Sequence, residues 1–195
     1  GVVCLGMLFV GGLNAWYLGS LILTAIPFSI YLVMSKPYRL RRLMAFINPW
    51  SDPQHGGYQI IQSLIALGSG GFLGVGLGNS KQKLLYLPAA HTDFIFPIIG
   101  EELGFIGALS IVGLFFIFAW RGMKISFHAP DLFGNMLAGG ITLMIVLQAI
   151  INMGVACALF PTKGLPLPLV SYGGSNLAFT LASIGILLNI SRQTV

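Results

Sequence analysis

Apolar residues form long runs along this chain, and polar connections separate the runs. The long runs lie at residues 16–35, 92–120, 135–157 and 171–190. A helix rises 1.5 Å per residue, so about 20 apolar residues are enough to cross the ~30 Å hydrocarbon core of a membrane. A shorter apolar stretch at residues 1–10 fits the end of one more helix. The pattern predicts an all-α fold, a polytopic transmembrane helical bundle with four full crossings and one partial crossing.

The longest polar interval, residues 36–91, separates the first two long runs. A structureless loop of this length is improbable in a folded domain, so the interval should carry its own elements. We expect a turn cluster at 49–53, a short helix at 58–67 and glycine-rich backbone at 68–78. The spaced glycines in the last part neither follow a strand nor open a βαβ unit, and a nucleotide-binding loop is therefore rejected.

The composition also indicates an integral membrane protein, because 56% of the residues are hydrophobic and only 8% are charged. Basic residues outnumber acidic ones by ten to five, and most of them cluster. One cluster contains Lys36, Arg39, Arg41 and Arg42, and a second contains Lys81 and Lys83. In a chain this apolar we expect such clusters to meet anionic lipid or a phosphorylated substrate, and no nucleic acid. The apolar start favours an internal or C-terminal fragment, with residues 1–195 forming a single membrane domain.

Three of the five acids, Asp93, Glu101 and Glu102, lie at the start of the run 92–120. This run predicts one membrane helix with Asp93 at its mouth, after a polar His91-Thr92 pair that can cap it. An ionisable residue there is a functional hypothesis by default, although a carboxylate at a helix N-terminus also stabilises the dipole without any catalytic role. The two glutamates point about 100° apart on a helix, so we expect one to pair inside the bundle and the other to bond a neighbouring helix. The same run contains three small residues for close helix packing, namely Gly100, Gly104 and Gly107.

Several segments resemble, in order, the motifs of one family of polytopic cell-wall polymerases. They read PYRLRR, NPWSDP, GYQIIQSLIALGSGG, GVGLGNSKQKLLYLP, HTDFIF, GEELGFIG and PTKGLPLPLVSYGGS. The ordered set is specific, and on it the chain resembles the SEDS family (shape, elongation, division and sporulation), its division branch above all. Two positions depart from the family pattern, since Ala89 stands where a Glu is common and Asn176 where a Ser is usual.

The resemblance implies a peptidoglycan glycosyltransferase that polymerises lipid II, a lipid-linked disaccharide-pentapeptide, into glycan strands during septal cell-wall synthesis in cell division. Asp93 falls on the aspartate that the family motif places in the active site, where it would act as the general base of an inverting displacement. The pyrophosphate leaving group needs positive or hydrogen-bonding partners. The candidate substrate-binding residues are Arg39, Arg41, Arg42, Lys81, Lys83, His91, Thr92, Lys163, Ser171, Gly173 and Gly174. Glu101 and Glu102 are expected to be structural, buried acids.

Other readings of these residues stay open. His91 also fits a cap, Arg41 and Arg42 also fit anchors to lipid headgroups, and the 171–175 segment fits either an anion site or a plain loop-to-helix join. No metal site is predicted, but a divalent cation, Mg²⁺ or Mn²⁺, that bridges Asp93 and the pyrophosphate is left open. The competing functions are a lipid II flippase, whose ionisable groups should lie near the membrane midplane, and a noncatalytic division scaffold.

The resemblance further implies a multi-pass protein of the bacterial cytoplasmic (inner) membrane at the division septum. Its expected partners are lipid II, a class B penicillin-binding protein and other divisome proteins. Most of the basic residues lie in the interval 36–91, and a charge count alone would place that interval in the cytoplasm. That rule weakens for long loops, so we follow the resemblance and expect 36–91 to be a large, structured extracytoplasmic loop.

Overall fold

The computed structural model describes residues 2–54, 57–80, 82 and 92–193, and every regular element in that part is helical. The elements are α1 (Val2–Val10), α2 (Ala15–Met34), α3 (Pro37–Ile47), a short 3-10 helix η1 (Pro49–Ser51), α4 (Tyr58–Ser69), α6 (Ile95–His128), α7 (Leu132–Ala156) and α8 (Gly174–Ser191). Four of them, α2, α6, α7 and α8, are long and apolar enough to cross a membrane. The predicted all-α bundle with four long crossings is confirmed within the described residues.

Local sequence decides where α6 ends and α7 begins. Pro130 disfavours a helical backbone at the residue before it, and Ala129 is extended, with φ −63° and ψ 134°. The Asp131 carboxylate then accepts a hydrogen bond from Gly134 N at 3.0 Å and caps α7. The helix α6 therefore continues to His128, through much of the polar connection that the sequence pattern placed after residue 120.

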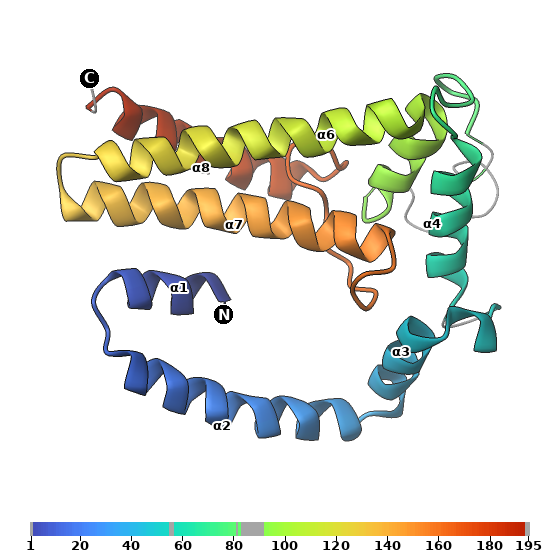
Figure 1. The fold of residues 1–195 in the computed structure, drawn as a ribbon, viewed down its shortest axis with the longest axis horizontal. Helices are drawn as coiled ribbons and strands as arrows, with labels where there is room; N and C mark the ends of the chain where they lie inside the picture. The colour runs from blue at the N-terminus through green and yellow to red at the C-terminus, as the bar shows by residue number, and fades with distance from the viewer. Residues whose placement is uncertain (1, 55–56, 81, 83–91, 194–195) are drawn as a thin grey trace.

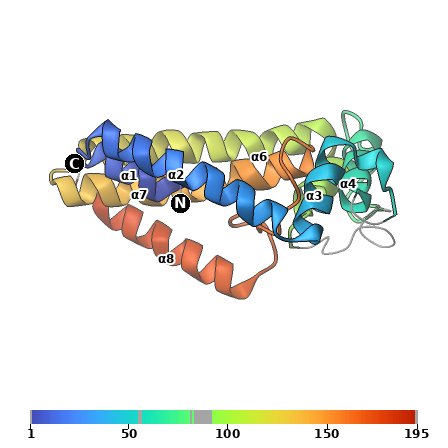
Figure 2. The ribbon, with the colours of Figure 1, turned by 90° about the horizontal axis from the view of Figure 1, so that it is seen from below.

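Figure 1 shows α6 and α7 side by side and antiparallel, with α8 running beside them in the direction of α6. The helix α4 stands across the end of this group where α7 ends, and the C-terminus lies at the opposite end. Figure 2 shows that α8 diverges from α7 toward its own N-terminus. The bundle therefore has two distinct ends, one next to α4 and one at the α6–α7 turn.

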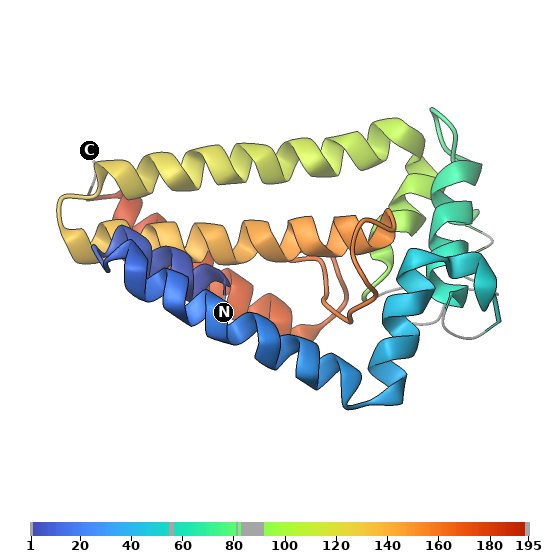
Figure 3. The ribbon, with the colours of Figure 1, turned by 60° about the horizontal axis from the view of Figure 1, so that its bottom comes forward.

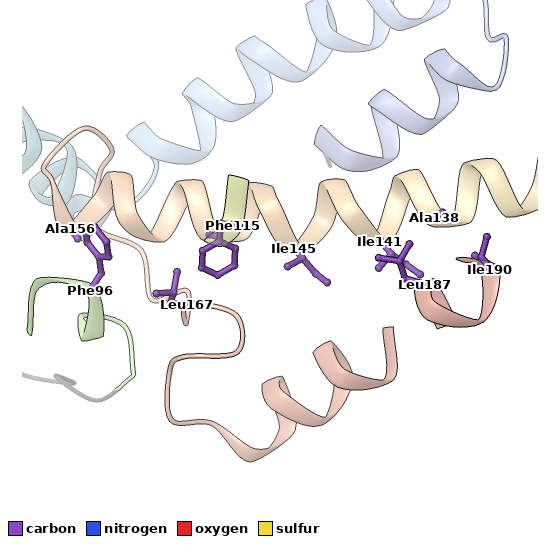
Figure 4. Close-up of a cluster of buried hydrophobic side chains, with 10 residues drawn as sticks. Phe96, Phe115, Ala138, Ile141, Ile145, Ala156, Leu167, Leu187 and Ile190 are labelled. Atoms are coloured by element: carbon purple, nitrogen blue, oxygen red, sulfur yellow. The ribbon is translucent and has the colours of Figure 1, made fainter. Parts of the chain in front are cut away.

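The helix α7 is the centre of the hydrophobic core (Figure 4). Its buried positions Ala138, Ile141, Ile145, Ala149 and Ala156 recur at helical spacing. They pack with Phe96 and Phe115 of α6, Leu167 of the following loop, and Leu187 and Ile190 of α8. A small residue lets α6 and α7 approach closely, because a Cβ at Gly122 would lie only 2.3 Å from Thr142 Oγ1.

The helix α6 is broken at Gly104, where φ is 70° and ψ is −165°. Residues with a side chain rarely adopt this φ, so the break requires glycine. The short part before Gly104 turns away from the long part at the end next to α4 (Figures 1 and 3). The single helix predicted for the run 92–120 is therefore corrected to two segments with a sharp bend between them.

The segment after α4 supplies the hydrogen bonds that this break removes from the helix. Val75 N donates to Glu101 O at 3.0 Å, and Gly76 N donates to Glu102 O at 3.1 Å. On the other side of the break, Phe105 N donates to Gly71 O at 2.8 Å. Backbone groups that are freed in a buried bend need such partners, so the glycine-rich stretch and the break stabilise each other.

The predicted small-residue face of α6 packs against α4 and its following segment instead of another spanning helix. A Cβ at Gly70 would lie 1.9 Å from Gly100 O, and a Cβ at Gly104 would lie 2.4 Å from Gly74 N. A Cβ at Gly107 would meet Leu103 of its own helix. These glycines therefore fix the interval after α3 to the start of α6.

The helix α2 contributes little to the core. It continues through Pro27, contacts mainly α1 and α3, and exposes almost all of its side chains. The sequence pattern did not predict α3, although Pro37 at its first position favours a helix start. The candidate site is built by the turn before α6, by α7, by the loop between α7 and α8 and by the start of α8.

Candidate active site

Asp93 lies in the turn 92–94, directly before α6. The helix α6 begins at the end of the bundle next to α4 (Figure 1). Phe94, rather than the polar pair before Asp93, occupies the N-cap position of α6, and it makes no side-chain capping bond. The first segment of α6 is short because of the bend at Gly104. Asp93 therefore sits on a turn whose position depends on contacts with other elements, not on a long straight helix.

Asn152 of α7 holds this turn against the loop between α7 and α8, residues 157–173. Its Nδ2 donates to Asp93 O at 2.8 Å and to Leu165 O at 2.6 Å. The side chain is only 2% exposed. Both partners are carbonyl oxygens, which can only accept hydrogen bonds. The amide of Asn152 must therefore be oriented with its nitrogen toward them, because its own oxygen could not donate to either. One side chain thus ties the Asp93 turn and the α7–α8 loop to the core helix.

Two more polar side chains fix the same loop. Ser171 Oγ accepts a hydrogen bond from Leu167 N at 2.7 Å and donates one to Thr92 O. Gln148 of α7 donates from Nε2 to Pro166 O at 2.9 Å. The loop is therefore bonded to α7 and to the residue before Asp93, and Ser171 has a structural role in this arrangement.

Gly164 brings the α7–α8 loop into direct contact with the Asp93 carboxylate. A Cβ at residue 164 would lie 2.8 Å from Asp93 Oδ2 and 3.6 Å from its Cγ. The first of these distances is shorter than real Cβ atoms show, so a side chain at residue 164 would require the Asp93 carboxylate to move. Lys163, the neighbouring residue, is exposed. The structure thus brings together Asp93 and the PTKG motif, which are far apart in the sequence.

The Asp93 carboxyl is half-buried, and burial raises its pKa above the ordinary aspartate value because desolvation disfavours the charged form. None of the described residues donates a hydrogen bond to this carboxylate or forms an ion pair with it. The protein therefore holds the backbone of the turn firmly and leaves the carboxylate oxygens available.

Gly173 and Gly174, two of the predicted binding residues, form the start of α8. Gly173 is its N-cap, with an extended φ of 177° and no side-chain capping bond, and Gly174 is the first helical residue. A Cβ at Gly174 would meet open space. The first backbone N–H groups of α8 thus receive no hydrogen bond from a side chain at the N-cap position.

The predicted basic residues of the interval 36–91 are placed only in part. Arg39 of α3 donates from Nη1 to Leu32 O at 2.8 Å and so braces the corner between α2 and α3. Arg41 and Arg42 also lie in α3, but their side chains are outside what the structure describes. Three further predicted residues, Lys81, Lys83 and His91, fall outside the described residues.

Glu101 is a buried acid with a polar partner. It is 3% exposed, and its Oε2 accepts a hydrogen bond from Ser80 Oγ at 2.5 Å. Ser80 lies in the segment after α4. Glu102 is half-buried beside it. Both residues also carry the carbonyls that the glycine-rich segment satisfies, so they belong to the join between that segment and the bend of α6.

No group of three His, Cys, Asp or Glu side chains lies close enough to hold a metal ion among the residues that the structure describes. At the site itself Asp93 is the single described carboxylate at the turn. Mg²⁺ can bind through one protein carboxylate when substrate phosphates and waters supply its other ligands. The donor set would therefore suit a cation that arrives with a phosphorylated substrate.

Sequence reasoning did not predict Asn152, Gln148 or Gly164 as site residues. Polar amides inside an apolar run were the available signal for the first two, because uncharged polar side chains in spanning helices tend to bond other helices or loops. No feature of the sequence indicates that Gly164 belongs to the site, because its importance comes from the approach of the distant Asp93 carboxylate, which only the fold determines.

Comparison with known proteins gives one consistent answer. A family model described as "Cell cycle protein", covering FtsW, RodA and SpoVE, matches residues 1–195. The "Probable peptidoglycan glycosyltransferase FtsW" of Geobacter sp. strain M18 is 50% identical over 191 residues, which cover 98% of this chain and 52% of that protein. Stage V sporulation protein E of Bacillus subtilis is 49% identical over 191 residues, again 98% of this chain and 52% of the relative. The chain thus spans about half the length of the curated relatives that it matches.

Solved structures agree with this match. A chain from a study of the structural coordination of polymerization and crosslinking by a peptidoglycan synthase complex is 30% identical, with a TM-score of 0.74, and the match covers 95% of this chain and 52% of that one. A mutant of the rod shape determining protein RodA from Thermus thermophilus is 35% identical, with a TM-score of 0.52 over 67% of this chain and 39% of that chain. The family model, the curated relatives and the solved structures agree, and the chain therefore belongs to the FtsW/RodA/SpoVE family of cell cycle proteins.

Proposed function

We propose that the protein containing this chain is a peptidoglycan glycosyltransferase that polymerises lipid II into glycan strands during septal wall synthesis. The names of its relatives support this proposal, since several are called "Probable peptidoglycan glycosyltransferase FtsW". The observation that carries it is the Asp93 turn. Asn152 and Ser171 hold its backbone, while none of the described residues occupies its carboxylate.

Asp93 would act as the general base. Its carboxylate would take the proton from the acceptor's sugar hydroxyl while that oxygen attacks the anomeric carbon of the donor. The new glycosidic bond forms as the bond from the anomeric carbon to the pyrophosphate breaks, and undecaprenyl pyrophosphate leaves. A single displacement inverts the anomeric centre and needs no carboxylate nucleophile, so one base suffices. The raised pKa of Asp93 suits this role, because a stronger base accepts the proton more readily.

The leaving pyrophosphate needs positive charge and hydrogen-bond donors. Lys163 is the described candidate, because it is exposed and adjoins the glycine that touches Asp93. The N-terminus of α8 at Gly173 and Gly174 is a second source of donors. Arg41, Arg42, Lys81, Lys83 and His91 stay candidates by sequence. A bound Mg²⁺ or Mn²⁺ would add charge neutralisation, and Asp93 is the described residue that could help to hold it.

The test is Asp93→Asn in the full-length protein, assayed by glycan strand formation from purified lipid II. The change keeps the shape of the side chain and removes the base, so strand formation should fall at least a hundredfold, within the range of general-base catalysis. Asp131→Asn is the matched control, because asparagine caps a helix as well as aspartate and residue 131 lies at the other end of the bundle. Wild-type strand formation by a folded Asp93→Asn protein would end the assignment.

The flippase reading depended on Glu101 as an ionisable group in the membrane. That carboxylate bonds Ser80 and lies at the bend of α6, and this contact supplies a structural reason for its burial. No described feature favours transport or a purely noncatalytic scaffold over the glycosyltransferase. A protein that moves lipid II across liposomes but forms no strands would favour the flippase.

We also propose that the interval 36–91 faces outward from the cytoplasmic membrane at the division septum. Lipid II can be polymerised there only if Asp93 and this interval lie on the outer side. A class B penicillin-binding protein, which would crosslink the new strands, and other divisome proteins are the proposed partners. The matched structure from a peptidoglycan synthase complex supports such an assembly. Co-purification with the septal rather than the elongation transpeptidase is the measurement that checks it.

A further inference from the structure

A cavity of about 510 Å³ lies between the last turns of α6 and α8. It occupies the end of the bundle near the α6–α7 turn, whereas α6, which Asp93 directly precedes, begins at the other end (Figure 1). Phe118, Ile184 and Leu188 give it apolar walls, and Ser191 adds a hydroxyl. The cavity is therefore separate from the candidate active site and has both an apolar and a polar side.

Three cationic or titratable side chains, Arg121, Lys124 and His128, line this cavity from α6. They are three and four residues apart, so they project from one face of the helix. No acidic side chain lines the cavity among the described residues. The acid nearest in sequence, Asp131, is occupied as the cap of α7 through Gly134 N. The polar side of the cavity consequently carries net positive charge.

The position of these residues along α6 matches the level of lipid headgroups. The segment from Phe105 to Trp120 is apolar and, at 1.5 Å per residue, about 24 Å long, most of a hydrocarbon core. Trp120 is 66% exposed, as expected for an aromatic residue at a membrane interface. Arg121 and the two following basic residues lie just beyond it. The apolar walls therefore face the depth of acyl chains, and the cations face the depth of phosphate.

We propose that this cavity binds the phosphate headgroup of an anionic phospholipid, with the first part of an acyl chain against Phe118, Ile184 and Leu188. Basic pockets between spanning helices are known to suit such headgroups. The lysine and arginine carry the recognition, and the apolar walls distinguish a lipid from free phosphate. The competing role for these cations is to offset the C-terminal dipoles of α6 and α8 without any ligand.

The test uses the full-length protein in neutral detergent and measures its Tm during titration with dioctanoyl phosphatidylglycerol. A ligand that binds the folded state raises the Tm with its concentration. Dioctanoyl phosphatidylcholine and inorganic phosphate are the comparison probes. We expect a saturable rise with phosphatidylglycerol and little with either comparison. Equal rises with phosphatidylcholine, or a rise with inorganic phosphate alone, would overturn the proposal.

Variants separate binding from folding. Arg121→Gln/Lys124→Gln should weaken phosphatidylglycerol binding about 30-fold, the equivalent of ~2 kcal/mol for two charges near a membrane surface. Leu188→Trp should weaken it by filling the cavity without changing the charge. Arg121→Lys/Lys124→Arg, which keeps both positive charges, should bind far more tightly than the glutamine double variant. A lower starting Tm in the glutamine double variant, with the lipid-induced rise intact, would show that the cations only stabilise helix ends.

Discussion

Replacing Gly164 with alanine is the sharpest test of how the protein positions Asp93. The added Cβ would lie 2.8 Å from Asp93 Oδ2, about 0.6 Å short of the 3.4 Å at which ordinary contact begins. Gly164 has no left-handed φ, so alanine is compatible with its backbone. The main consequence is therefore a displacement of the carboxylate, not a strained loop.

The magnitude follows from that displacement. Relief by the carboxylate alone moves it by about 0.6 Å, and a misplacement near 1 Å can cost on the order of 100-fold in rate. We expect kcat for strand formation to fall by about 10- to 100-fold. The free energy of unfolding should change by less than about 1 kcal/mol, because alanine restricts the unfolded chain while the contact adds some strain.

The assay is glycan strand formation from lipid II by the full-length protein, with kcat and KM measured separately and thermal unfolding measured in parallel. Gly185→Ala in α8 is the matched control, because its Cβ would meet open space. It should keep the wild-type rate. A Gly164→Ala protein with the wild-type kcat would refute the view that this contact sets the position of the base.

Three further predictions follow from the same geometry. Burial raises the pKa of Asp93, so this base becomes protonated at a higher pH than an ordinary aspartate. Strand formation should therefore fall as the pH drops through that raised pKa. A midpoint at or below about 3.9 in a pH–rate profile would contradict this prediction. Asn152→Ala removes two part-buried hydrogen bonds and leaves two carbonyls without their donor, so the free energy of unfolding should fall by about 1–3 kcal/mol. In the same variant kcat should fall while KM changes less, and denaturant titration and kinetics can check both effects. The third prediction concerns topology and uses a protein in which the native cysteines are replaced and one new cysteine is introduced at an exposed position, either Asn79→Cys or Arg192→Cys. A membrane-impermeant maleimide applied from outside should label the first and spare the second. The reverse pattern would place Asp93 on the cytoplasmic side.

The chain's local pattern was enough to place its long helices. Apolar length and the polar connections predicted α2, α7 and α8 to within a few residues, because in a bilayer each spanning segment must satisfy its own backbone and must be apolar over its full length. The short helix α4 was likewise visible from its spacing. The helix α3 was missed, since a charged amphipathic stretch in a long interval gives no such length signal.

The candidate chemistry was predictable only as residue types. Asp93 drew attention because a carboxylate in an apolar run is costly, and PTKG because a lysine beside a glycine-rich turn can bind an anion. Neither signal indicated that Gly164 touches the Asp93 carboxylate or that Asn152 bonds both segments. These contacts join residues that are far apart in the chain.

The sequence by itself determined the class of protein and the number of long apolar helices, because hydropathy is a property of short windows, whereas the candidate base came from the resemblance of the motif around Asp93 to a known family. Only the tertiary structure decided that α6 bends at Gly104, since the bend persists only where the segment after α4 supplies the backbone partners that the helix loses. It likewise decided the setting of Asp93, because the pKa, contacts and exposure of a carboxylate depend on which distant backbone packs against it.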